Sequence, residues 1–338
     1  MVSTENKKYK VTHYNDLCYN PANLKFGVIC LNKYGDAIFS PIYVTFEVDE
    51  EADVDFIGAN VTRWDFINHA LRFQQGTVYE RMAVSSEDFL SIQCYLPSKN
   101  EQVHISSLIR VLDNRIEKQQ SYVDALKKYK RGVIQHIFRR SHGQTESQQW
   151  QQVRLGDIFK KVSRRNTDGK IKNVITNSAE YGLIPQRDFF DKDIAIEGNT
   201  ENYYVIENGD FVYNPRKSIT APYGPFNRYT LKDQGIISPL YTCLVLKVNI
   251  NPSYLAWYFK SDAWHRYIYD NGSQGVRHDR VSMTDDLLMG IPVIFPDRTT
   301  QDSIANALDL VENRLHLAQN KMDLLNMTRK GFMQQLFI

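Results

Sequence analysis

The residues best suited to bind a ligand are amides and cations in short loops of the second half of the sequence. The stretch Tyr213-Asn214-Pro215-Arg216-Lys217 combines a turn with one amide and two cations. Asparagine and arginine side chains can make paired hydrogen bonds with the edges of adenine and guanine, and lysine can pair with a phosphate. This stretch is therefore a candidate for contacts with a nucleic acid.

Further basic residues lie in neighbouring clusters and offer partners for phosphate groups. The full set of candidates for nucleic-acid binding is Lys160, Lys161, Arg164, Arg165, Lys170, Lys172, Tyr213, Asn214, Arg216, Lys217, Arg228, Arg277, His278 and Arg280 in the second half, with Tyr19, Asn20, Lys25 and Arg81 in the first. For each basic residue the alternative is an ordinary solvated surface. For the tyrosines and asparagines, which form a repeated Tyr-Asn-Pro, the alternative is a shared structural turn.

Composition and motifs argue against catalysis and metal binding. The formal net charge of +2 is too small to indicate a nucleic-acid partner by itself. No histidine or cysteine pair has metal-ligand spacing, so no metal site is expected. Both Tyr-Asn-Pro stretches resemble part of the catalytic motif of adenine methyltransferases, but they lack its second proline and its following aromatic residue. The absence of a secretory signal and of a membrane-spanning run predicts a cytoplasmic protein.

Two long helices are predicted at residues 102–138 and 301–337, which align with each other without a gap. Apolar residues alternate at steps of three and four in both helices, which is typical of a coiled-coil seam. The predicted seam consists of Ile105, Ile109, Leu112, Ile116, Val123, Leu126, Ile304, Leu308, Val311, Leu315, Met322 and Leu325. Lys130 and Arg329 interrupt it at equivalent positions. Either they extend their charges to solvent, or this basic end of the first helix faces phosphate or a partner protein.

The segments that precede the two helices also repeat. Matching stretches include Ser40-Pro-Ile-Tyr43 and Ser238-Pro-Leu-Tyr241, among short strand-like runs broken by turns. The expected fold is α+β, with two mixed α/β domains separated by two long antiparallel coiled-coil helices and an internal two-fold pseudo-repeat. The predicted parts are a first domain at 1–97, a spacer helix at 98–140, a linker at 141–149, a second domain at 150–296 and a C-terminal spacer helix at 297–338.

Over nearly its whole length the sequence resembles the specificity subunits of Type I restriction-modification enzymes. The resemblance is carried by Trp150-Gln-Gln-Val-Arg-Leu-Gly-Asp-Ile-Phe159, by the helix ends at 127–138 and 328–337, and by the tandem order. It implies two target-recognition domains that each read half of a split site in double-stranded DNA. It also implies a non-catalytic subunit that directs two adenine-N6 methyltransferase subunits and the restriction subunits. No cofactor of its own is expected, because S-adenosylmethionine, ATP and Mg²⁺ belong to those partners.

The first domain departs from the family pattern. No counterpart of the Trp150 opening precedes Asp16, so this domain is expected to be shortened at its N-terminus. Its acidic run from Glu47 to Asp55 favours a second hypothesis, a degenerate scaffold that binds partner subunits without specific DNA reading. An adenine methyltransferase is the third hypothesis, but a glycine-rich cofactor loop after a strand is missing from the sequence.

Overall fold

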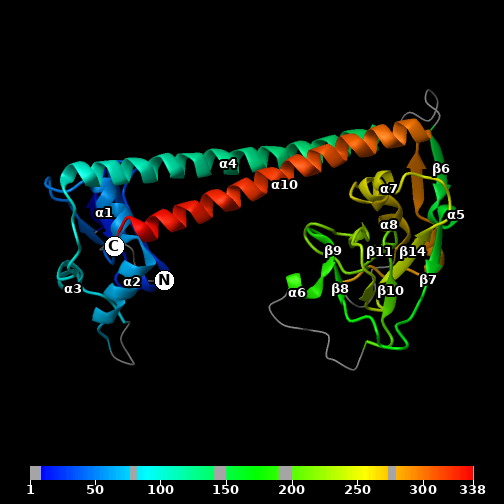
Figure 1. Ribbon diagram of the computed structural model, residues 1–338, viewed down its shortest axis with the longest axis horizontal. Helices are drawn as coiled ribbons and strands as arrows, with labels where there is room; N and C mark the ends of the chain where they lie inside the picture. The colour runs from blue at the N-terminus through cyan, green and yellow to red at the C-terminus, as the bar shows by residue number, and fades with distance from the viewer. Residues whose placement is uncertain (1–8, 77–81, 141–149, 190–199, 273–278, 338) are drawn as a thin grey trace. The chain divides into compact units, whose positions relative to one another are not determined.

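The structure is a computed structural model that describes residues 9–76, 82–140, 150–189, 200–272 and 279–337. The chain forms two compact units. Unit 1 comprises Met1–Val123 and Leu317–Ile338, and unit 2 comprises Asp124–His316. Each long helix contributes one part to each unit, so each unit consists of one domain and the portions of both helices that belong to it (Figure 1).

Unit 1 contains a three-stranded antiparallel sheet in the order β3-β2-β5 and a separate strand pair, β1-β4. Its strands are β1 Lys10–Thr12, β2 Leu17–Tyr19, β3 Ile29–Leu31, β4 Ala37–Phe39 and β5 Val44–Phe46. Its short helices are η1 Leu24–Phe26, α1 Val54–Val61, α2 Trp64–Ala70, η2 Leu71–Phe73 and α3 Ser86–Leu90. Aromatic rings form the core: Phe89 stacks on Tyr19 and on Phe46, with ring centroids 4.7 and 5.6 Å apart.

Unit 2 contains a four-stranded sheet in the order β12-β11-β14-β7 and the strand pairs β15-β6, β10-β13 and β8-β9. Its strands are β6 Gln151–Arg154, β7 Phe159–Val162, β8 Ile175–Ser178, β9 Gly182–Pro185, β10 Tyr204–Ile206, β11 Phe211–Tyr213, β12 Phe226–Arg228, β13 Gly235–Ile237, β14 Thr242–Leu246 and β15 Pro292–Phe295. Its short helices are α5 Leu155–Ile158, α6 Gln186–Phe189, α7 Pro252–Phe259, α8 His265–Asn271 and α9 Asp285–Met289.

The core of unit 2 is packed around the aromatic side chains of α7. Phe259 stacks on Phe226 of β12 with 3.9 Å between ring centroids. Tyr254 and Tyr258 are buried, and their hydroxyls donate to backbone carbonyls of β15 at 2.7 and 2.9 Å. These hydrogen bonds make burial of the two hydroxyls tolerable and fix β15 against α7.

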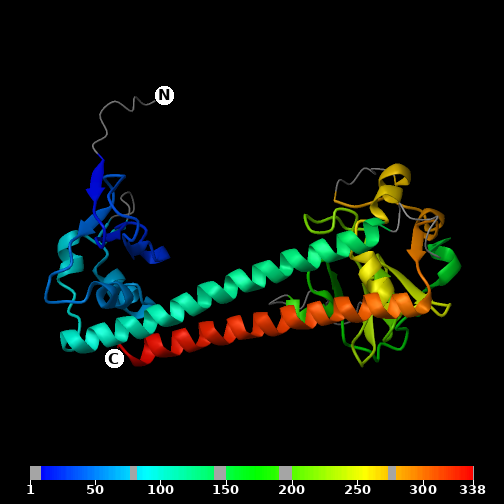
Figure 2. The same cartoon turned by 90° about the horizontal axis from the view of Figure 1, so that it is seen from above.

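The long helices α4 (Lys99–Arg140) and α10 (Arg298–Gln335) confirm the predicted helix pair. They run antiparallel and lie side by side in both views (Figures 1 and 2). Every predicted seam residue is buried or half-buried, and the buried ones are Ile109, Leu112, Val123, Leu308 and Met322. The heptad pattern therefore identified the faces that pack together.

Polar residues interrupt the seam at matching positions of the two helices. In unit 1 the buried Gln119 amide donates to a backbone carbonyl of α10 at 2.8 Å, and Arg329 pairs with Asp113. In unit 2 Lys130 pairs with Glu312 at 2.6 Å. Lys130 and Arg329 thus end in ion pairs with the opposite helix. Because each pair joins opposite charges across the seam, it favours this register over neighbouring ones.

The start of each long helix is tied to its domain by a buried glutamine. The Gln102 side chain accepts from the backbone N–H of Asp53, which is the N-cap of α1, at 2.9 Å. It also donates to the backbone carbonyl of Pro97 at 2.8 Å. Gln301 makes the same two bonds, both at 2.8 Å, with Asn251, the N-cap of α7, as its donor. The internal repeat therefore extends to single hydrogen bonds, and α1 is the counterpart of α7.

The C-terminal end of each long helix carries a phenylalanine that packs on the corresponding domain helix. Phe138 of α4 is fully buried and lies 5.6 Å, between ring centroids, from both Tyr254 and Tyr258 of α7. Phe337, which follows α10, stacks on Phe56 of α1 at 5.0 Å. In each unit the end of one long helix is thus anchored beside the start of the other.

Unit 2 contains one segment without a counterpart in the described part of unit 1. It runs from β6 to α6 and adds β7 to the sheet, so the sheet has four strands in unit 2 and three in unit 1. The shortening of the first domain stays a prediction, since residues 1–8 lie outside the described residues.

We predict that Phe138→Ala destabilises unit 2 more than Phe337→Ala destabilises unit 1. Removing the fully buried ring leaves a cavity, at a cost of about 3–5 kcal/mol, whereas Phe337 is only half-buried. Hydrogen exchange of the intact chain, followed separately in α7 and α1, measures both effects. Equal effects of the two substitutions would contradict the difference in burial.

Candidate nucleic-acid interface

The Tyr-Asn-Pro loop of unit 2 connects β11 to β12 and is closed at its base by Asn214 and Gly224. The Asn214 side chain accepts from the backbone N–H of Arg216 at 2.9 Å, and the Asn214 backbone N–H donates to the Pro225 carbonyl at 3.0 Å. Gly224 has a φ of +85°, and a Cβ there would lie 2.0 Å from the Asn214 carbonyl oxygen. Glycine is therefore required at this position, while most residues between Pro215 and Gly224 remain partly or fully exposed.

A second segment brings another cation to this loop. The Lys217 N–H donates to the Asp279 carbonyl at 2.8 Å, and a β-bridge joins Arg216 to Arg280. The Asp279 carboxylate lies 3.8 Å from Arg216 and 3.7 Å from Arg280. We call Arg216, Lys217 and Arg280 the arginine cluster. Two guanidinium groups lie near one carboxylate there, Lys217 is next to Arg216 in the chain, and the Arg216 side chain is 65% exposed.

Burial raises the pKa of the neighbouring Tyr241 above its ordinary value, and both arginines of the cluster oppose that shift. The direction of the shift keeps the tyrosine protonated near neutral pH. The cluster therefore combines positive charge with a neutral hydroxyl group.

A buried network of asparagines supports the loop from below. Asn177 of β8 donates to the Val212 carbonyl at 2.9 Å, and Asn227 donates to the Asn177 side chain at 2.8 Å. Asn214 donates to the Asn177 carbonyl at 3.3 Å. Sequence reasoning did not single out Asn177 or Asn227, because their roles depend on the packing of β8 against the main sheet and no local signal marks them.

Arg164 is held inside unit 2 by carboxylates. It pairs with the buried Asp210 and lies 3.3 Å from Glu207. Burial raises the pKa of the Asp210 carboxyl, while the backbone N–H of Glu207 and the charge of Arg164 act in the opposite sense. This arrangement favours a structural role for Arg164, because its guanidinium is already bonded within the fold.

The remaining basic candidates of unit 2 lie apart from the arginine cluster in the chain. Lys160 and Lys172 are exposed, and the structure gives neither an ion pair within the described residues. Three others have polar partners: Lys161 with Asp285 at 2.5 Å, Arg165 with Asn202 at 3.1 Å and Lys170 with Asp168 at 2.9 Å. Exposed pairs of this kind are weak, so these side chains remain available to an anion.

The side chains of Arg228 and Tyr213 are largely buried rather than presented at the surface. Burial lowers the pKa of Arg228, which is attracted by Asp309 of α10. Burial raises the pKa of Tyr213, whose hydroxyl donates to the Tyr223 carbonyl at 2.8 Å. For Tyr213 this burial agrees with the structural-turn alternative, while a DNA contact of Arg228 stays a prediction.

The Tyr-Asn-Pro loop of unit 1 has the same frame. Asn20 is buried and accepts from the N–H groups of Ala22 and Asn23, both at 3.2 Å. The Pro21 carbonyl accepts from Val84 at 3.2 Å, as the Pro215 carbonyl accepts from Val281 at 2.9 Å. Burial of both tyrosines and both asparagines favours the shared structural turn over ligand contact.

The tip of the unit 1 loop differs from that of unit 2. Lys25 is exposed and lies 5.1 Å from the ring centroid of Phe26, which is itself 69% exposed. The positions of Arg216 and Lys217 are occupied in unit 1 by Ala22 and Asn23, so the unit 1 loop has no cation directly after its Tyr-Asn-Pro. The candidates Arg81, Arg277 and His278 lie outside the described residues.

The described residues hold no group of three or more histidine, cysteine or acidic side chains placed to bind a metal ion. Among the helices described, none is long and apolar enough to cross a membrane.

Comparison with solved structures identifies the fold. An S subunit of a Type I restriction-modification system from M. genitalium matches with a TM-score of 0.58 at 15% identity, covering 98% of this chain and 84% of its own. The chain has the fold of a Type I S subunit. A structure described as showing complex assembly and conformational transition of the type I R-M system matches with a TM-score of 0.57 at 17% identity, covering 97% of this chain and 83% of its own.

The likeness to the S-subunit fold is not accompanied by a sequence match. No family model matches the chain, and no curated protein matches it. Low identity over nearly the whole length means that the architecture is shared while most side chains differ.

We predict that Gly224→Ala disturbs the base of the unit 2 loop more than Gly182→Ala disturbs β9. Both glycines have positive φ, which costs a substituted alanine about 1–2 kcal/mol, but a Cβ at Gly182 meets no atom within 4 Å. Only Gly224→Ala adds a clash with the backbone of Asn214. Faster hydrogen exchange at the Asn214 amide in that variant alone is expected, and similar exchange in both variants would contradict the clash.

Proposed function

We propose that this protein is the DNA sequence-recognition subunit of a Type I restriction-modification complex. In this role it reads a split target site and directs adenine methyltransferase and restriction subunits to it. The S-subunit fold supports the proposal, and the arginine cluster is the observation that carries it. Backbone hydrogen bonds join two loops distant in sequence that carry Arg216, Lys217 and Arg280, and such a gathering of basic residues suits an anionic partner.

The chemistry of the cluster fits DNA in two ways. An exposed guanidinium can donate two hydrogen bonds to guanine, and Lys217 can pair with a phosphate. The Asp279 carboxylate lies 3.8 Å from Arg216 and 3.7 Å from Arg280. Exposed pairs at this distance are weak, so both guanidinium groups remain available to an anionic partner.

Partner subunits require a surface of their own. In unit 1, α10 exposes Leu317, Leu324 and Met327, each more than half exposed, on the side away from the seam. Exposed apolar residues at such spacing suit a partner helix. We propose that two methyltransferase subunits and the restriction subunits hold the catalytic groups, with S-adenosylmethionine, ATP and Mg²⁺, and that this chain is non-catalytic.

A degenerate scaffold is the second candidate function, and one observation favours it. In the described part of unit 1 the Tyr-Asn-Pro loop carries Lys25 but no arginine, and the segment from Glu47 to Asp55 is acidic. Unit 1 would then bind partners while unit 2 alone reads DNA. Methylome sequencing of a host that expresses this chain with its methyltransferase distinguishes the candidates: a split adenine motif supports two reading domains, and a single half-motif supports one.

We predict that Arg216→Ala and Arg280→Ala weaken binding of the assembled complex to its target by about 1–3 kcal/mol each and relax only the half-site read by unit 2. Arg266→Ala, which removes a cation paired with Asp270 on α8, is the matched control and should leave the sequence preference unchanged. Affinities are compared at one salt concentration. Equal losses for all three variants would contradict a specific role for the cluster.

The proposal gives α4 and α10 the role of a spacer between half-sites. Inserting one heptad into each helix, beside Gln119 and Ala318, keeps the seam in phase and adds about 10 Å of helix. The spacer between methylated half-sites should lengthen by about 3 bp, at 3.4 Å per base pair, with the same bases read. An unchanged spacer in the methylome would contradict the role.

A further inference from the structure

In unit 2 one continuous segment covers two strand edges. We call residues 151–162 the strap. Its first strand, β6, pairs antiparallel with β15, and its second strand, β7, pairs antiparallel with β14. Between them the single turn of α5 buries Leu155 and Ile158, which are 0% and 3% exposed. The strap therefore contributes backbone hydrogen bonds to two edges and apolar side chains to the core.

Unit 1 has both receiving edges but no strap within its described residues. The counterpart of β14 is β5, which pairs only with β2 there. The counterpart of β15 is Gln93–Leu96, which forms no strand. Tyr95 and Leu96 are 79% and 50% exposed, whereas the buried residues of β15 are at most 1% exposed.

The helix beneath this edge also differs between the units. In unit 2 the hydroxyls of Tyr254 and Tyr258 hold β15 against α7. In α1 the same positions carry Phe56, which has no hydroxyl, and Asn60, whose side chain accepts from Arg63 at 2.7 Å. Among the described residues, these two hydrogen bonds therefore have no counterpart between α1 and Gln93–Leu96.

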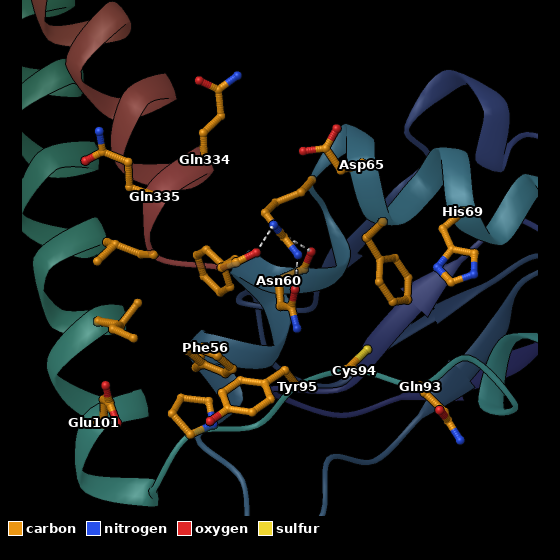
Figure 3. A pocket seen from close by; sticks show the side chains of 16 residues that line it. Phe56, Asn60, Asp65, His69, Gln93, Cys94, Tyr95, Glu101, Gln334 and Gln335 are labelled. Carbon is orange, nitrogen blue, oxygen red and sulfur yellow. Dashed lines mark hydrogen bonds between the residues drawn. The ribbon is translucent and has the colours of Figure 1, made fainter.

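A pocket of about 510 Å³ lies between the edge segment and the helices of unit 1. Figure 3 shows Tyr95 of the edge segment beside Phe56 of α1, and Gln334 and Gln335 at the end of α10 also line the pocket. An apolar side chain from an added strand would find room here. Unpaired edges with exposed apolar residues are ready templates for another strand.

The charges near this edge of unit 1 indicate which kind of segment could bind there. The strap carries adjacent Lys160 and Lys161, and Lys161 pairs with Asp285 in the first turn of α9. The counterpart of α9 is α3, whose first turn contains Glu87 and Asp88. An acidic run also begins at Glu47, directly after β5. A basic strand would therefore meet opposite charge at this edge.

We propose that unit 1 binds a basic, extended segment of a second polypeptide. This segment pairs with Gln93–Leu96 and with β5 as the strap pairs with β15 and β14, and it places apolar side chains between the two edges. At β5 the interaction is β-strand addition to an existing edge, and at Gln93–Leu96 the segment becomes a strand when it pairs. It does not depend on whether the protein reads DNA.

A peptide with the sequence of residues 150–162 tests the proposal on the intact chain. Saturable binding is expected, with hydrogen exchange slowed on the order of tenfold at Gln93–Leu96 and Val44–Phe46. A control peptide with Leu155→Asp and Ile158→Asp should lose this protection, and one with Lys160→Glu and Lys161→Glu should bind more weakly. Absence of protection at both edges, or equal protection by all three peptides, would overturn the proposal.

Two further measurements distinguish a partner polypeptide from other possible occupants of the unit 1 edge. Fusing the same thirteen-residue sequence through a flexible linker to the N-terminus of the full chain should raise the melting temperature of unit 1 and leave unit 2 unchanged, and the doubly aspartate-substituted fusion should raise neither. A dimer that protects the same amides without peptide would assign the edge to a second copy of this chain. That result would overturn the proposal of a different polypeptide partner.

Discussion

The structure depends on the apolar seam between α4 and α10. Helices in proteins gain most of their stability from the packing of one apolar face, and here each long helix provides that face for the other. Each seam residue therefore stabilises both helices at once. The polar positions within the seam are equally constrained, because Lys130 and Arg329 reach acidic partners at the matching heptad positions of the other helix. A shift of one heptad would separate these charges.

The seam was predictable because a heptad repeat is a local pattern that survives in any tertiary context. The two-fold repeat was predictable for the same reason, since it relies on residue order alone. These features require knowledge of neither a distance nor a side-chain partner.

The candidate site was less predictable, because contacts distant in sequence decide whether a polar side chain is bonded within the fold or exposed. Arg164 and Arg216 are equally basic and both follow strands, yet Arg164 is bound by Asp210 and Arg216 is largely exposed. The convergence of Arg216 with Arg280 requires a β-bridge between segments far apart in the chain. Asn214 was identified for its chemistry, but the structure uses its amide to close a turn.

The closed base of the Tyr-Asn-Pro loop separates stability from specificity. In both units the base is held by an asparagine side chain and by backbone hydrogen bonds, none of which involves the side chains at the tip. The two tips nevertheless differ in length and charge. A loop built this way can exchange its tip residues without repacking the core, so new binding preferences can arise in one domain while its fold and its partner surfaces persist.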